Sequence, residues 1–367
     1  MQILIELYDE EQILNLISAC ALKPDRVIFL YTAAQNNLIH NALIERLVQT
    51  ETEYVEYTYE SLGSILEQFD GENVIVDVHG GDDLAVSMVS QMARSRGYTL
   101  CYPGMTTSQL YFLENEQVRT EKLDMPKLTV RQIVELYGGI VRDLPESYFD
   151  DYGRKAVDEC LSEKRKNSTR WISFCKAMGS IGSHQKEYDV WKADEKFFHT
   201  YGDIVEHLEH IFDRTEDSGY LLKFHDPAYK ILVTDTGVPF EYETYYQIAD
   251  SGAFDDTDLR VNIDWNGGAF VAGDPNSELD VVASKDSRLI SISCKAGKYD
   301  QQAIYEVKAN ADKFGGERSV PVLCVDIDME RPEYVEKARE LNVLLIEYRQ
   351  MREKKAAELI LKWMETH

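Results

Sequence analysis

The sequence lacks several features that would assign a protein quickly to a class. None of its apolar runs, in 367 residues, approaches the length needed to span a bilayer. The N-terminus passes into acidic residues without the positively charged region of a secretory signal. Neither G-x-G-x-x-G nor G-x-x-x-x-G-K-[ST] occurs, which argues against an ordinary nicotinamide or nucleoside-triphosphate site. We therefore expect no membrane association and a location in the cytoplasm.

Basic residues and cysteines are also few. Lys and Arg number 39 against 65 Asp and Glu, so the formal net charge is -26. This balance argues against broad, non-specific wrapping of nucleic acid, but it allows an enzyme with a local basic groove and a metal site. The six cysteines form no C-x-x-C pair, and several stand in apolar runs. We expect buried free thiols rather than disulfides or a zinc site.

The first half of the chain alternates apolar strands with amphipathic helices. The length of the chain favours two domains. The alternation predicts an α/β domain with a doubly wound parallel sheet. The expected strands are residues 2–7, 26–31, 54–58, 73–78 and 98–102, and the expected helices are 11–22, 37–49, 61–69 and 83–94.

Two loops of this domain stand out, because ligands of such sheets bind at the carboxyl ends of the strands. The first is residues 32–37, and the second is residues 79–83, which contain the pair Gly80 and Gly81. Paired glycines let backbone N–H groups approach a phosphate closely at the start of a helix. The alternative is that both loops are tight turns without a ligand.

The opening of the chain, ILIELYDEEQILNLISACALKPDRVIFLYT, together with the later VIVDVHGGDD, resembles the CARF domain, a CRISPR-associated Rossmann-like sensor of cyclic oligoadenylates. The resemblance implies that the two loops hold the cyclic ligand. The negative charges of Asp82 and Asp83 disfavour contact with phosphate. Asp82 is therefore expected to contact a ribose hydroxyl or an adenine edge, or to cap the following helix. The implied ligand residues are Thr32, Gln35, His79, Gly80, Gly81 and Asp82.

The middle of the chain, residues 145–220, has a polar, helical pattern and the highest density of basic residues. It is expected to link the two domains. Its basic side chains have two interpretations, a solvated helix face or part of a groove that follows a phosphate backbone. Trp171 and Phe174, which lie among them, can accordingly pack in a core or stack on bases.

The last part of the chain predicts a second α/β unit around a hairpin at residues 278–295. An Asp near one strand and a Lys at the end of the next is the arrangement of a metal-dependent phosphodiesterase, although both residue types also flank hairpins as solvated side chains. The other expected strands are residues 229–234, 260–265, 320–326 and 343–346, and the expected helices are 240–249, 301–314, 332–341 and 349–364.

The segments GVPFEYETYYQI, RVNIDW, NSELDVV, SISCK and AIYEVKANADKFGG resemble the restriction-endonuclease-like PD-(D/E)xK domain of CARF-fused CRISPR ancillary nucleases. In this resemblance Glu241 is the acid of the first helix, Asp280 is the acid of the central strand, and Lys295 is the lysine. Glu278 stands in the same stretch as Asp280 and is expected to support the metal ligands.

The chain departs from this pattern at Ser293, where the family has Asp or Glu. A hydroxyl is a weak ligand for a hard divalent ion. Either the metal, Mn or Mg, is held by Asp280, Glu241, the backbone carbonyl of Cys294 and waters, or the site is impaired. Because Glu241, Asp280 and Lys295 are all present, we favour an active site.

The resemblance implies three segments: a CARF effector-binding domain at 1–145, a helical linker region at 146–225 and a nuclease domain at 226–367. It implies a homodimeric endonuclease of type III CRISPR antiviral defence, activated by a cyclic oligoadenylate such as cyclic tetra-adenylate, that cleaves single-stranded or duplex DNA or RNA. One alternative is a non-catalytic sensor with a decayed nuclease site. Another is a sensor that degrades its own ligand, for which His79 and Gln35 are the suggestive residues.

Overall fold

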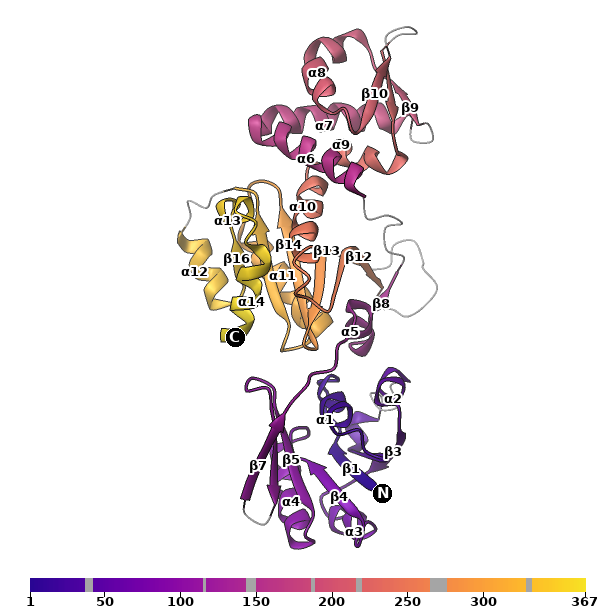
Figure 1. Cartoon of the computed structure of the whole chain (residues 1–367), viewed down its shortest axis with the longest axis vertical. Coiled ribbons are helices and arrows are strands. Elements are labelled where there is room, and N and C mark those ends of the chain that lie inside the picture. Colours follow the sequence, from indigo (N-terminus) through magenta and orange to yellow (C-terminus); the bar gives the residue numbers. More distant parts are fainter. Residues whose placement is uncertain are drawn as a thin grey trace.

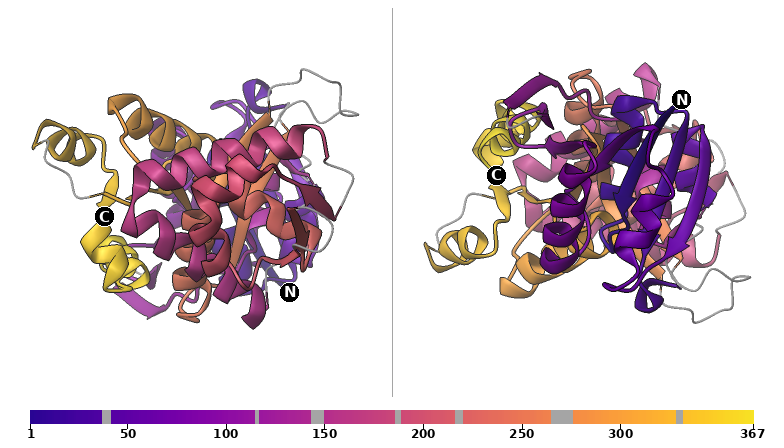
Figure 2. Two further views of the ribbon diagram at one scale, coloured as in Figure 1. Left: turned by 90° about the horizontal axis from the view of Figure 1, so that it is seen from above. Right: turned by 90° about the horizontal axis from the view of Figure 1, so that it is seen from below.

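The computed structural model describes residues 1–36, 42–114, 117–142, 150–185, 189–215, 220–264, 276–327 and 332–367. The start of the helix predicted at 37–49, the end of the loop at 32–37 and Trp265 lie outside these residues. The described strands form a seven-stranded, a six-stranded and a three-stranded sheet. These follow one another along the longest axis of the molecule, with the six-stranded sheet in the middle (Figure 1). Seen down that axis, the three parts overlie one another (Figure 2).

The seven-stranded sheet has the order β3-β2-β1-β4-β5-β6-β7, with β1 to β5 parallel. Alternate residues of β1 pack on opposite faces: Ile3 and Ile5 join one apolar cluster and Leu4 joins another. Helices therefore cover both faces, and the predicted doubly wound α/β fold is confirmed. The elements are β1 Gln2–Leu7, α1 Leu14–Leu22, β2 Arg26–Tyr31, η1 Ala33–Gln35, α2 Ala42–Val48, β3 Glu51–Glu56, α3 Leu62–Glu67, β4 Asn73–Asp77, α4 Asp83–Ser95, β5 Thr99–Gly104, β6 Gln109–Glu114 and β7 Gln117–Lys122.

The six-stranded sheet has the order β16-β15-β14-β13-β12-β8. Its first strand, β8, comes directly after helix α5 and pairs with β12 at Val141 and Ile263. The segment 130–141 thus joins the second sheet, although the expected boundary at 145 placed it with the first domain. The elements are α5 Val130–Leu136, β8 Ile140–Val141, α10 Val238–Ala249, β12 Asp256–Asp264, β13 Asn276–Lys285, β14 Arg288–Lys295, α11 Gln301–Gly315, β15 Val320–Val325, α12 Pro332–Glu340, β16 Leu344–Ile346, α13 Tyr348–Arg352 and α14 Ala356–Thr366.

The middle of the chain differs from its prediction, because it contains a three-stranded antiparallel sheet as well as helices. The strands have three or four residues each, too few to show a period of two in the sequence. The elements are α6 Asp151–Lys166, α7 Ser168–Ser183, β9 Val190–Lys192, α8 Glu195–His207, β10 Phe212–Thr215, β11 Leu221–Phe224, η2 Pro227–Tyr229 and α9 Lys230–Thr234.

Two further predictions were wrong. Residues 229–234 form the end of η2 and helix α9, not a strand. The Asp226 side chain accepts a hydrogen bond from the Ala228 N–H at 2.8 Å, which starts a helical turn before this apolar run. The helix predicted at 349–364 is divided into α13 and α14, because Lys354 between them has a φ of 55°.

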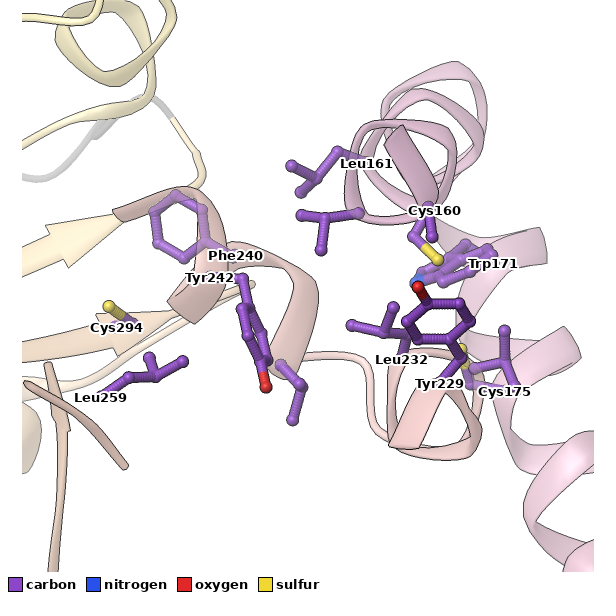
Figure 3. Close-up of a cluster of buried hydrophobic side chains, with 14 of the residues drawn as sticks. Cys160, Leu161, Trp171, Cys175, Tyr229, Leu232, Phe240, Tyr242, Leu259 and Cys294 are labelled. Atoms are coloured by element: carbon purple, nitrogen blue, oxygen red, sulfur yellow. The ribbon is translucent and has the colours of Figure 1, made fainter. Parts of the chain in front are cut away.

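Trp171 and Phe174 are fully buried, so they pack in a core and are not available for stacking on bases. Their cluster extends from the helices α6 to α9 through α10 to the six-stranded sheet. Figure 3 shows Trp171 and Leu232 at one end of this cluster, and Phe240 and Leu259 at the other. Through this shared core, the middle of the chain packs against the sheet that carries the expected nuclease residues.

Most of the basic residues of α6 and α7 are engaged in ion pairs. Arg154 pairs with Asp250 and Arg170 with Asp203. Lys164, which is buried, pairs with Asp326 at the end of β15. These pairs favour a structural role over a groove that follows a phosphate backbone.

All six cysteines are free, and five of them are buried, as predicted. None of the described helices combines the length and the apolar character needed to cross a membrane.

Candidate functional site

Asp280 lies on β13 and is held by the backbone of the neighbouring strand β14. Its Oδ2 atom accepts hydrogen bonds from the Cys294 N–H at 2.6 Å and from the Ser293 hydroxyl at 3.3 Å. Because N–H and C=O of one residue point the same way in an extended strand, the Cys294 carbonyl is also directed toward β13. The structure therefore brings Asp280, Ser293 and the Cys294 backbone together.

Glu241 comes from the other side of this site, in the first turn of α10, which contacts β12, β13 and β14. Its burial, and then the negative charge of Asp280, raise the pKa of Glu241 to about 8, against the lowering effect of Arg260. Burial also raises the pKa of Asp280, while the Cys294 N–H and the positive charge of Lys295 lower it. Two half-buried carboxylates thus stand close enough for one to disfavour the charge of the other.

Lys295 ends β14 and lines a cavity of about 480 Å³. In the residues that the structure describes, no carboxylate pairs with its amine at salt-bridge distance. The cavity contains a second amine, an aromatic ring and the first turns of α11. Its other lining residues are Lys298, Tyr299, Asp300, Gln302, Ala303 and Glu306.

Glu278 and Glu241 are bridged by one guanidinium, that of Arg260 on β12. Arg260 Nη1 lies 3.2 Å from Glu241 Oε2, and Nη2 lies 3.0 Å from Glu278 Oε1. Sequence reasoning did not single out this arginine, since an Arg that opens a strand pattern carries no distinctive signal.

The oxygen donors suit a divalent ion that keeps part of its water shell. Glu241, Asp280 and a backbone carbonyl are hard ligands of the kind that Mg²⁺ or Mn²⁺ takes. The carboxylates of Glu241, Asp280 and Glu278 do not form one compact cluster of possible metal ligands. Within the described ranges, the three residues whose ligand atoms do form such a cluster are Glu159, Glu209 and His210, and Glu159 is hydrogen-bonded to the His210 ring.

The residues expected to bind an effector lie at the carboxyl ends of β2 and β4, the two parallel neighbours of β1. Gly81 has a φ of 84°, and its N–H donates to Asp9 Oδ2 at 3.0 Å. A Cβ on Gly80 would lie 2.5 Å from the Leu7 carbonyl oxygen. Both positions therefore require glycine, and Asp9, which follows β1, is a residue of this site that sequence reasoning missed.

Asp82 caps helix α4, as one of the alternatives predicted. Its Oδ1 atom accepts from the N–H groups of Leu84 at 3.0 Å and Ala85 at 2.9 Å. Thr32 and Gln35 form a capping box, and the Gln35 side-chain amide donates to the Tyr8 carbonyl at 2.8 Å. These contacts fix the loops after β1 and β2 against each other.

His79 points toward the hairpin of β5 and β6, where its ring meets that of Tyr102 edge-on at 5.2 Å. Burial lowers the pKa of His79, which favours the neutral imidazole. Tyr102 is 46% exposed although aromatic. It lines a cavity of about 450 Å³ with Gly104, Met105, Thr106, Thr107 and Tyr111. Nothing in the sequence marks this cavity, because a tyrosine in a strand pattern is typical of a core.

No known protein family matches the sequence, and no curated protein is similar to it in sequence. Solved structures do share its fold. The protein VC1899 from Vibrio cholerae is 13% identical, with a TM-score of 0.79 over 99% of this chain and 98% of its own. Can2 from Sulfobacillus thermosulfidooxidans, solved with cyclic tetra-adenylate, is 19% identical, with a TM-score of 0.71 over 99% of both chains.

A third structure is a type III CRISPR defence DNA nuclease activated by cyclic oligoadenylate. It is 13% identical, with a TM-score of 0.52 over 90% of this chain and 46% of its own. At these identities the likeness establishes the fold. The fold extends over nearly the whole chain in the first two cases, so it includes both the Gly80–Gly81 loop and the sheet that carries Asp280.

Proposed function

We propose that this chain is a nuclease of type III CRISPR defence that depends on a divalent metal ion and is activated by a cyclic oligoadenylate. The observation that supports the proposal is the hydrogen bond from the Cys294 N–H, directly before Lys295, to Asp280, in a chain whose fold matches Can2 from end to end. Can2 was solved with cyclic tetra-adenylate, and we take the same class of ligand as the activator here.

In this proposal Asp280 is the main metal ligand, and Glu241 assists it directly or through water. The Cys294 carbonyl offers a third oxygen on the same side of the strand. A bound Mn²⁺ or Mg²⁺ supplies Lewis-acid stabilisation of the phosphate and a more acidic water. Lys295 orients the attacking water and stabilises the negative charge that develops on the pentacovalent phosphate. Its lack of a carboxylate partner in the described residues keeps the amine available.

The substrate is proposed to enter along the cavity beside Lys295. Lys298 adds a second positive charge, and Tyr299 adds an aromatic ring. A phosphodiester needs room for its neighbouring nucleosides, and this cavity offers it next to the lysine that acts in the reaction. Asp300 and Glu306 also line the cavity, so the positive charge available to the phosphate is that of the two lysines alone.

The effector is proposed to bind at the loops after β1, β2 and β4. The side chains of Thr32, Gln35 and His79 and the backbone of the two glycines, on the loops that follow β2 and β4, are the groups proposed to contact it. A cyclic oligoadenylate has rotational symmetry, so a two-fold homodimer can present the same loops to both halves of the ring. Effector binding then shifts the dimer toward a nuclease-competent arrangement.

A non-catalytic sensor is the second candidate, and one contact favours it. The Ser293 hydroxyl binds Asp280 at the position where an acid is expected, so the metal loses one hard ligand.

One experiment separates the two candidates. Labelled DNA and RNA are incubated with the full-length protein, with and without cyclic tetra-adenylate and Mn²⁺. The nuclease requires cleavage that needs both additions. A protein that binds the cyclic ligand but cleaves nothing is the sensor.

A further inference from the structure

Arg260 has an unusual backbone conformation for a strand residue. Its φ is 54°, in the left-handed region that residues other than glycine rarely adopt. It lies between Leu259, which pairs with Val281, and Val261, which pairs with Leu279, so Arg260 stands opposite Asp280. A strained residue of this kind persists only where its surroundings hold it, and such residues are concentrated at functional sites.

Both strands also change the direction in which they face at this point. Residues two apart in a regular strand share a face. Yet Leu259 packs in the apolar cluster of α10, and Val261 packs in the cluster of α5. Val281 and Leu279 on the partner strand are divided in the same way. The irregular backbone at Arg260 is therefore built into the pairing of β12 with β13.

The guanidinium of Arg260 forms ion pairs with two acids of the candidate site. Its Nη1 atom lies 3.2 Å from Glu241, and its Nη2 atom lies 3.0 Å from Glu278. The Arg260 side chain is 21% exposed and that of Glu241 is 14% exposed, so water screens this pair only in part. The planar fork of an arginine suits such bridging, which a lysine cannot reproduce.

We propose that Arg260 is a positioning residue that acts as the internal counter-cation of the metal-free site and competes with the divalent ion for Glu241. This inference rests on the proposed function. A carboxylate oxygen that coordinates an ion is no longer free to accept from a guanidinium. Entry of the ion therefore releases Nη1 from Glu241, while Nη2 keeps Glu278 in place. Before the metal binds, Arg260 keeps Glu241 and Glu278 in position. Its competition for Glu241 lowers the affinity of the site for the metal.

The test is calorimetric titration of Mn²⁺ into the full-length protein and its Arg260→Gln variant. We expect the variant to bind Mn²⁺ about tenfold more tightly, because loss of a competing interaction of about 1.4 kcal/mol changes a dissociation constant tenfold. We also expect the metal-free variant to melt at a lower temperature and to gain more from Mn²⁺ than the wild type does. Arg154→Gln is the matched control, because it removes an Arg–carboxylate pair at Asp250, the other end of α10. Its Mn²⁺ affinity should equal that of the wild type.

Unchanged or weaker Mn²⁺ binding by Arg260→Gln, with a wild type that binds, overturns the inference and leaves the nuclease proposal standing. If neither protein binds Mn²⁺, the metal-dependent function fails, and the inference fails with it. Should Arg260→Gln not fold, Arg260→Lys keeps a charge but loses the bridge. It should bind Mn²⁺ more tightly than the wild type, and equal affinity would contradict the competition.

Discussion

The Tyr137 hydroxyl donates a hydrogen bond to Glu11, and this contact joins the two large sheets. Glu11 follows β1 and donates its N–H to Asp9 at 2.8 Å, and Asp9 in turn holds the N–H of Gly81. On the other side, Gly316, directly after α11, lies so close to Glu11 that an added Cβ would clash with its carboxylate. Helix α11 begins at the cavity of Lys295. A continuous set of contacts thus runs from the expected effector loops to the expected nuclease site.

The first prediction concerns this connection. Tyr137→Phe removes the hydrogen bond to Glu11 and little else, so effector affinity should change by less than about twofold while the activation of cleavage falls about tenfold. Titration calorimetry and a cleavage assay measure the two quantities. Tyr98→Phe, which loses a hydroxyl bonded to Asp70 at 2.8 Å directly before β5 of the seven-stranded sheet, is the control. Normal activation of Tyr137→Phe would show that the contact does not transmit the signal.

The second prediction concerns Tyr102. Loss of its exposed ring in Tyr102→Ala should weaken cyclic tetra-adenylate binding about tenfold, because base–aromatic stacking contributes about 1–3 kcal/mol. Tyr102→Phe keeps the ring and should bind like the wild type. Calorimetry on both variants decides the matter, and equal affinities for Ala and Phe would place the base elsewhere.

Much of the fold can be predicted from the sequence, because its buried strands are apolar runs. Strands β1, β2 and β4 are continuous buried segments, and each strand of the β13–β14 hairpin also contains a run of four buried residues. Strand β7 was missed because all six of its residues are exposed and Val118 alone among them is apolar, so no pattern of burial marks it. Its pairing is decided by β6 alone.

The site could be predicted only in part. Asp280, Glu241 and Lys295 were predicted from the resemblance of their segments to the restriction-endonuclease-like domain. Arg260 could not be found, because its role depends on a left-handed backbone that no sequence period reveals. Tyr102 acquires its place only when the β5–β6 hairpin brings it to His79.

The third prediction concerns Ser293. An acid here adds a hard oxygen beside Asp280, whose Oδ2 atom lies 3.3 Å from the Ser293 hydroxyl. Ser293→Glu should reach half-maximal activity at a lower Mn²⁺ concentration, with little gain in rate at saturating metal, because tighter ground-state binding alone does not speed a reaction. Ser293→Gln is a neutral control of similar shape. If both variants shift the midpoint equally, charge is not the cause.

The fourth prediction concerns stability and pH. Asp77 pairs in register with Glu6, and both are buried. Burial raises the pKa of Asp77 from its ordinary value near 4 to about 6, against hydrogen bonds from Ser18 and His79. The folded state therefore holds this proton after the unfolded chain has lost it, and stability falls as pH rises from about 4 to about 6.

Asp77→Asn removes this effect and can keep the acceptor for the His79 N–H. Relative to the wild type, the variant should gain up to about 3 kcal/mol in free energy of unfolding between pH 4 and pH 7. Urea denaturation at a series of pH values measures the difference. A difference that does not vary with pH would mean that Asp77 is not protonated in the folded protein.

The central claim is that Asp280 holds a catalytic metal. The most direct measurement is the cleavage rate of Asp280→Asn with saturating cyclic tetra-adenylate and Mn²⁺. The Asn side chain can still accept from the Cys294 N–H, so the fold and the effector affinity should be retained. Asp286→Asn, in the turn of the same hairpin, is the control. We predict that Asp280→Asn cleaves at about one-hundredth of the wild-type rate or less, while Asp286→Asn cleaves normally. Cleavage by Asp280→Asn at the wild-type rate would contradict the account.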